Sequence, residues 1–176
     1  MKVIVVAVDW SENSERAVEM ASDLAAKYDA ELVAVHVITD KPFLSDERHL
    51  AEIEFADEIK KYPGSGFSTE GPDSTSIELK DIVSEHEGKD RVLRSIIGDM
   101  LLKRAQRAAY GKGVETVDTV RSEGNVADAI LMTAKERKAD LIVVGSRGMG
   151  AMGEIFLGSI SHKVNQLSDI SVVTVK

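Results

Sequence analysis

A glycine-rich stretch directly after an apolar run constrains the fold of this chain more than any other feature. Residues 145–159 read GSRGMGAMGEIFLGS; they follow the β-type run 141–144 and precede a helical pattern. Glycine lets the backbone take positive φ and lets a ligand come close, and a helix start adds free N–H groups and a partial positive charge. The stretch predicts either a strand-to-helix turn that suits a phosphate group or two unrelated turns that flank a loop.

Apolar runs and helical patterns alternate along the rest of the chain. Residues 2–8 form a β-branched run typical of a strand buried on both faces. Ser11 and Asn125 are good helix caps. We expect strands at 2–8, 31–38, 115–121, 141–144 and 171–176, and helices after Ser11, at about 89–110, from Asn125 to about 138 and at 155–167. This order predicts an α/β fold with an open, mainly parallel five-stranded sheet and helices on both faces, Rossmann-like, with ligands at the carboxyl ends of the strands.

The negative charge is concentrated in one segment. Residues 40–90 hold 14 of the 30 acidic residues but only 6 of the 22 Lys and Arg residues, so the formal charge of −8 belongs to this segment. All three prolines lie there too. We therefore expect one domain over residues 1–176 with an acidic insert at about 40–90. Within it, 46–62 has a helical pattern, and 63–76 has the composition of a flexible linker or, alternatively, of a defined functional loop.

Composition excludes several classes of protein. Nucleic-acid binding calls for clustered Lys and Arg, which an acidic chain lacks. No apolar run approaches the ~18–20 residues of a membrane span, so no membrane partner is expected. The first residues resemble a signal peptide, but the apolar run ends at Asp9 with no cleavage site, so we interpret them as a strand. Cysteine is absent, which excludes thiolate chemistry and fits a cytoplasmic protein.

Two nucleotide-binding motifs can be rejected on their context. Gly148, Gly150 and Gly153 match the dinucleotide pattern G-x-G-x-x-G, but the following strand, 171–176, ends in Lys176 instead of the required acidic residue. A Walker A sequence is absent, because Lys112 is followed by glycine and precedes a strand. The four histidines show no metal-ligand spacing. We therefore predict neither catalytic nor metal-binding side chains, and His36 in the second strand is interpreted as structural.

Three polar residues near the glycines each keep more than one interpretation. Asp9, at the end of the first strand, fits a hydrogen-bond acceptor for a ribose or base, a water-mediated metal contact or a simple helix start. Ser159 fits a hydroxyl bond to a phosphate or a plain helix start. Arg147 fits a charge-assisted bond to a phosphate, worth ~1.5–3 kcal/mol, or a solvated loop side chain.

The combination of these motifs resembles the universal stress proteins, in their ATP-binding branch. The resemblance covers residues 1–39 and about 90–176. It rests on Asp9 to Ser11 after the first strand, His36-Val37 in the second, and Gly145-Ser-Arg-Gly148 followed nine residues later by Gly158-Ser159. It implies ATP with Mg²⁺ bridging the phosphates, and a homodimer in which strand 171–176 pairs with its copy. An exposed edge strand also favours such pairing.

The resemblance also implies a set of binding residues. Ala7, Val8 and Asp9 would lie near the adenine and ribose, Val37 over the base, Val144 and Gly145 beside the ribose and α-phosphate, and Arg147, Gly148, Gly158, Ser159 and Ile160 around the phosphates. The chain departs from the family at Trp10, where a smaller residue is usual, and in its long acidic insert. Trp10 would crowd the base or stack on it, and the insert would cover the crevice or repel a polyanion by its charge, so both departures would change the affinity for a nucleotide.

Three functions are compatible with these residues. The first is an ATP-binding regulatory protein of the stress response with little or no hydrolysis. The second is a slow ATPase or nucleotidyl-transfer enzyme, for which no residue can be named to position water or an acceptor. The third is a scaffold protein that acts through its acidic insert without a nucleotide.

Overall fold

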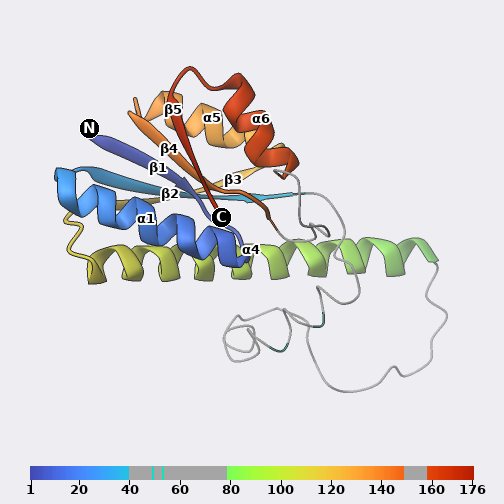
Figure 1. Ribbon diagram of the computed structural model, residues 1–176. Coiled ribbons are helices and arrows are strands. Elements are labelled where there is room, and N and C mark those ends of the chain that lie inside the picture. Colours follow the sequence, from blue (N-terminus) through green and yellow to red (C-terminus); the bar gives the residue numbers. More distant parts are fainter. Residues whose placement is uncertain (40–48, 50–52, 54–78, 149–157) are drawn as a thin grey trace. The chain divides into compact units, whose positions relative to one another are not determined.

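The computed structural model describes residues 1–39, 49, 53, 79–148 and 158–176 (Figure 1). Contacts between Cα atoms divide the chain into two compact units. One unit comprises Met1–Thr39 and Gly98–Lys176, and the other comprises Asp40–Ile97. The first unit carries the five strands that the structure describes.

The helices and strands alternate as the sequence predicts. In chain order they are β1 (Val3–Ala7), α1 (Glu12–Tyr28), β2 (Glu31–Ile38), α4 (Leu79–Gly111), β3 (Val117–Glu123), α5 (Val126–Glu136), β4 (Leu141–Gly145), α6 (Ser159–Leu167) and β5 (Ser171–Val175). Ser11 caps α1, because its hydroxyl accepts the N–H of Ser14, and Asn125 caps α5 through the N–H of Asp128. Both predicted caps are confirmed.

The five strands form one parallel sheet in the order β3-β2-β1-β4-β5. The chain starts in the middle of the sheet, runs outward to β3, and then returns to the other side of β1. Helix α1 lies on one face, and α5 and α6 lie on the other (Figure 1). The predicted fold class, an open parallel sheet with helices on both faces, is confirmed.

Apolar residues of the strands fill the space between the sheet and its helices. Successive side chains in a strand point to opposite faces. On the α5 side, one cluster of buried residues joins β1, β2 and β4 to α5 and α6: Val5, Val33, Val35, Val37, Ala127, Ala129, Ile130, Ala134, Ala139, Ile142, Val144 and Val164. The alternate residues Ile4 and Val6 are also fully buried. Burial on both faces explains why the runs are apolar throughout.

Some predicted boundaries were wrong. The third strand was expected at 115–121 but covers Val117–Glu123, because pairing of Leu32 with Val117 and of Ile38 with Glu123 fixes its register. The helix expected at 89–110 begins ten residues earlier, at Leu79. Residues 84–91 hold only polar residues and one glycine, so the apolar periodicity that marked the rest of the helix is interrupted there. Helix α5 ends at Glu136 instead of 138, where Lys138 takes a left-handed φ of 52°.

Several expectations for the acidic insert lie outside the described residues. Of the expected helix 46–62, only His49 and Ile53 are described, and both are helical. The expected linker 63–76 is not described, nor are residues 155–157 at the expected start of the last helix. Among the residues that the structure describes, no helix combines the length and apolar character that a bilayer-spanning segment needs.

Candidate nucleotide site

The strand order reverses between β1 and β4, and this makes their carboxyl ends the natural place for a ligand. The two strands are neighbours, with Val6 opposite Val143. After β1 the chain enters α1 on one face of the sheet, whereas after β4 it reaches α6 on the other face (Figure 1). The connections therefore diverge at these strand ends, which is where open α/β sheets bind ligands. We refer to this place, between the residues that follow β1 and those that follow β4, as the crevice.

Asp9 is held in this crevice by the first turn of α1. Its carboxylate Oδ1 accepts both the backbone N–H of Ser11, at 3.0 Å, and the Ser11 hydroxyl. Its own N–H donates to the hydroxyl of Ser14, which is almost fully buried. The Ser11 hydroxyl also lies 3.2 Å from the carbonyl oxygen of Arg147. The helix cap thus joins the end of β1 to the turn after β4.

The turn after β4 packs tightly against α1 and β5. The N–H of Ser146 donates to the carbonyl of Val175, and its hydroxyl accepts the side-chain amide of Asn13 at 3.2 Å. A Cβ on Gly145 would lie 3.0 Å from the backbone carbonyl carbon of Asn13. This contact is tighter than Cβ atoms normally make, so a side chain here would require the α1 backbone to move by a few tenths of an ångström. The approach of α1 therefore favours glycine at 145.

Gly148 meets Asp9 directly. A Cβ on Gly148 would lie 2.7 Å from Asp9 Oδ2, the carboxylate oxygen that does not accept from Ser11. The side chain of Asp9, which follows β1, is thus in van der Waals contact with Gly148, which follows β4. This oxygen faces the place where the two connections diverge.

The N-terminus of α6 differs from those of α1 and α5. Its cap is Gly158, which forms no side-chain cap bond, and its first turn holds no acidic residue. By contrast, α1 and α5 have side-chain caps and acidic residues in their first turns. The first N–H groups of a helix have no partner within the helix. Within the described residues no side chain caps these groups at α6, and the helix dipole there favours an anion.

Gly158 is fastened to the β4 turn. Its N–H donates to the carbonyl of Ser146 at 2.7 Å, and the buried Ser161 hydroxyl lies 2.9 Å from that same carbonyl. A Cβ on Gly158 would be 3.1 Å from Ser146 O and 3.3 Å from the Cα of Arg147. The start of α6 is therefore anchored next to the end of β4, beside the crevice.

Burial changes the titration of two groups at this end of the sheet. Burial raises the pKa of the Asp9 carboxyl, while the two bonds from Ser11 and the charge of His36 act in the opposite direction. Burial lowers the pKa of His36, against the effects of its bond to the Val8 carbonyl and of the carboxylates of Asp9 and Asp99. Both groups are less easily charged than in water.

The structure brings most of the predicted residues to this crevice. Ala7 ends β1, Val8 and Asp9 follow it, Gly145 ends β4, Arg147 and Gly148 follow that strand, and Gly158, Ser159 and Ile160 start α6. The side chains of Ser159 and Ile160 are exposed. The side chains of Val37 and Val144 belong to the buried cluster on the α5 face, so their predicted contacts with base and ribose stay predictions.

Sequence reasoning missed the polar side chains that fix the crevice. Ser11 was interpreted as a helix cap, and no role in fixing the crevice was predicted for Ser14, Ser146 or Ser161, although all three are buried. Their roles depend on neighbours that are distant in the chain. One feature of the sequence could have indicated this role for Ser14. Serine at both 11 and 14 places a second hydroxyl about one helical turn after the cap.

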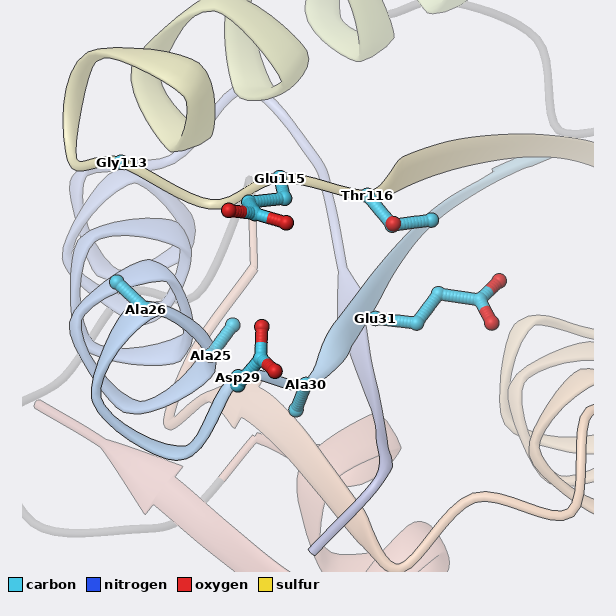
Figure 2. A pocket seen from close by; sticks show the side chains of 8 residues that line it. All are labelled: Ala25, Ala26, Asp29, Ala30, Glu31, Gly113, Glu115 and Thr116. Carbon is cyan, nitrogen blue, oxygen red and sulfur yellow. The ribbon is translucent and has the colours of Figure 1, made fainter.

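Two hollows lie on the unit that carries the strands. One, of about 40 Å³, lies at the amino ends of β2 and β3, and three acidic residues, Asp29, Glu31 and Glu115, are among those that line it (Figure 2). These negative charges make it unsuitable for a phosphate. The other, of about 170 Å³, borders the crevice, since Val8 and Asp9 form part of its wall, and Leu101 and Ala105 of α4 form another part.

Comparisons with known proteins agree with this geometry. A model of the universal stress protein family matches residues 1–62 and 65–176. Universal stress protein YxiE of Bacillus subtilis is 33% identical over 98% of this chain and 97% of its own length. A universal stress protein of Thermus aquaticus is 31% identical over 93% of this chain and 90% of its own length.

Solved structures share the fold. The universal stress protein UspA from Lactobacillus plantarum superposes with a TM-score of 0.68 at 19% identity, covering 99% of this chain and 97% of that one. A universal stress protein in complex with cAMP gives 0.61 at 23% identity and the same two coverages. One from Archaeoglobus fulgidus in complex with dAMP gives 0.56 at 20% identity, covering 100% and 98%. The family model and the relatives confirm the resemblance: this chain belongs to the universal stress protein family.

Proposed function

We propose that this chain binds an adenine nucleotide, ATP with Mg²⁺, in the crevice between β1 and β4, and serves as a regulatory protein of the stress response. The observation that carries the proposal is the pairing of two features. The start of α6, which has no side-chain cap bond and no acidic residue in its first turn, is anchored beside the β4 turn, and the Asp9 carboxylate lies against Gly148 in the same turn. One end suits phosphates, and the other suits a ribose or base.

The residues present fit such a ligand. The absence of a side chain lets Gly148 lie against Asp9 and Gly158 lie against Ser146 and Arg147. Glycine also lets a phosphate come close to the backbone N–H groups. In the proposal, Arg147, Gly148, Gly158, Ser159 and Ile160 hold the phosphates, Val144 and Gly145 flank the ribose and α-phosphate, and Ala7, Val8, Asp9 and Val37 lie near the nucleoside. The complexes of structural neighbours with cAMP and dAMP support the choice of an adenine nucleotide.

The Mg²⁺ ion would be held through the nucleotide. Among the described residues, no group of three or more His, Cys, Asp or Glu side chains is arranged to hold a metal. Phosphate oxygens are the usual ligands of Mg²⁺ in such sites, together with few protein groups. When bound, the ion would neutralise phosphate charge, which matters in a chain with a formal charge of −8.

We propose little or no hydrolysis. In the described part of the crevice, the Asp9 carboxylate already accepts two hydrogen bonds from Ser11 through Oδ1. Its remaining oxygen suits a ribose hydroxyl better than an attacking water, because it faces the nucleoside end in this proposal. Binding itself requires only backbone donors and one hydroxyl.

Nucleotide released from the purified protein tests this proposal. The protein is denatured, the chain is removed, and the supernatant is analysed by mass spectrometry and ultraviolet absorbance; the dialysed protein is then titrated with Mg-ATP. We expect about one adenine nucleotide per chain and a rise in melting temperature with added Mg-ATP. Gly158→Val should abolish the rise, whereas Gly111→Ala, where no atom lies within 4 Å, should keep it. A protein that is empty and ignores Mg-ATP would contradict the proposal.

We further propose a cytoplasmic homodimer that pairs through the strand at 171–176. Strand β5 lies at one edge of the sheet, next to β4 only, and its residues 171–174 are partly or fully exposed. An edge strand offers unpaired backbone groups to a second chain. Sedimentation equilibrium should give twice the chain mass of 19.1 kDa; a monomer at all concentrations would refute the pairing.

A further inference from the structure

His36 of β2 holds the end of β1 in place. Its ring Nδ1 lies 2.8 Å from the carbonyl oxygen of Val8. A carbonyl only accepts, so Nδ1 carries the proton and Nε2 does not. The N–H of Val8 donates in turn to the carbonyl of Val35, also at 2.8 Å. Both backbone polar groups of Val8 are therefore bonded to β2.

The hydrogen bonds of Val8 also determine where Asp9 lies. Asp9 is the next residue, and its own N–H is fixed by the Ser14 hydroxyl. The peptide between the two residues is thus held on one side by β2 and on the other by α1. Without the bond from His36, the carbonyl of Val8 would lose this bond, and the peptide would be held only through the Asp9 N–H.

Helix α4 leaves space for the histidine ring by means of a glycine. A Cβ on Gly98 would lie 2.6 Å from Cδ2 and 3.1 Å from Nε2 of His36. Glycine inside a helix is disfavoured relative to alanine, and the ring supplies a reason for its presence here. The position of the ring is therefore set jointly by β2 and α4.

Three charged side chains act on the ring. Asp9 follows β1, Asp99 belongs to α4, and Arg121 of β3 pairs with His36 across the sheet and bonds to Asp99 at 2.9 Å. Asp9 and Asp99 favour the charged ring, whereas Arg121 and burial oppose it, burial most strongly. The balance keeps the ring neutral, with one donor and one acceptor nitrogen.

We propose that His36 is a positioning residue for the nucleotide: its Nδ1–H fixes the Val8 carbonyl and thereby sets where Asp9 meets the nucleoside. This inference rests on the proposed function. It assigns to His36 a role at the nucleoside end of the ligand and none at the phosphates. Substitutions of His36 should therefore weaken the binding of AMP and of ATP equally. Substitutions of Gly158 should weaken the binding of ATP more than that of AMP.

Paired substitutions at position 36 test this role. Asparagine places an N–H on the atom that corresponds to Nδ1, so His36→Asn keeps the donor, while His36→Leu removes it. We expect His36→Leu to raise the dissociation constants of AMP and ATP by about 3–10-fold, the effect of one lost hydrogen bond, and His36→Asn to stay within about twofold of the wild type. Val117→Ala, a core change at the opposite end of the sheet, should lower the melting temperature without this loss of affinity.

Gly98→Ala provides a test that does not depend on lost stability. It improves the helix locally but forces the ring away from Val8. It should weaken both nucleotides as His36→Leu does. If His36→Leu or Gly98→Ala binds like the wild type, or if His36→Asn binds as weakly as His36→Leu, the proposal is wrong.

Two further measurements separate this inference from the proposed function. A wild-type chain that binds no nucleotide overturns both. Nitrogen NMR of the His36 ring needs no nucleotide: a protonated Nδ1 and a bare Nε2 are expected at pH 7.5, and the reverse tautomer would overturn the positioning role alone.

Discussion

Replacing Gly148 by alanine should weaken both the folded state and the crevice, because the new methyl group would collide with Asp9. Its Cβ would lie 2.7 Å from Oδ2, well inside the ~3.5–4.0 Å of a favourable contact between heavy atoms. The carboxylate is a side-chain end and can rotate, but rotation breaks its bonds from the N–H and hydroxyl of Ser11. Each is worth ~0.5–1.5 kcal/mol, so we expect a loss of ~1–3 kcal/mol in the free energy of unfolding.

A double-mutant cycle with Asp9→Ala isolates this collision. Without the carboxylate, Gly148→Ala should be neutral or should stabilise by ~0.4–1 kcal/mol, the usual effect of restricting the unfolded chain. The assay is urea unfolding of the four proteins at pH 7 without nucleotide. A coupling energy above ~1 kcal/mol is expected, whereas effects that add within ~0.5 kcal/mol would refute the contact between Gly148 and Asp9.

Three other perturbations have defined outcomes. Gly145→Ala should lower the free energy of unfolding by ~1–3 kcal/mol through overpacking against Asn13, whereas Gly111→Ala should not; equal urea midpoints would disprove this. Ser11→Ala should cost ~1–2 kcal/mol, as for other helix caps, and a change below ~0.3 kcal/mol would show that the cap is dispensable. Burial lowers the pKa of His36, so at mildly acidic pH the unfolded chain binds more protons than the folded chain. The contribution of the neutral ring to the free energy of unfolding should therefore be complete above pH 6.5 and should be lost as pH falls toward the pKa of the folded state. Urea unfolding from pH 7.5 to 5 should show this decline and His36→Asn should not.

The general architecture followed from the sequence because its signals are local. The apolar run 31–38 is bounded by polar residues at both ends, and β2 occupies it as predicted. Ser11 and Asn125 mark helix starts by their own side-chain chemistry. By contrast, Val114, Val117 and Val120 do not alternate with period two, so only pairing with β2 defines where β3 begins.

The candidate site was predictable in part. Glycines at fixed spacing after a strand indicate a turn and a helix start, and Gly145, Gly148 and Gly158 lie there. The reasons for these glycines were not predictable, because they depend on Asn13, Asp9 and the β4 turn. Likewise, nothing local to His36 reveals that its ring reaches the carbonyl of Val8.

Amide chemical shifts recorded during a titration with Mg-ATP test the central claim most directly. If the nucleotide binds in the crevice, the amides of Asp9, Gly145, Gly148 and residues 158–160 should shift together and saturate at about one nucleotide per chain. The amides of Gly113 and Glu115, at the opposite end of the sheet, should stay unchanged. No shifts at the carboxyl ends of β1 and β4, or shifts confined to the amino ends of the strands, would contradict the account.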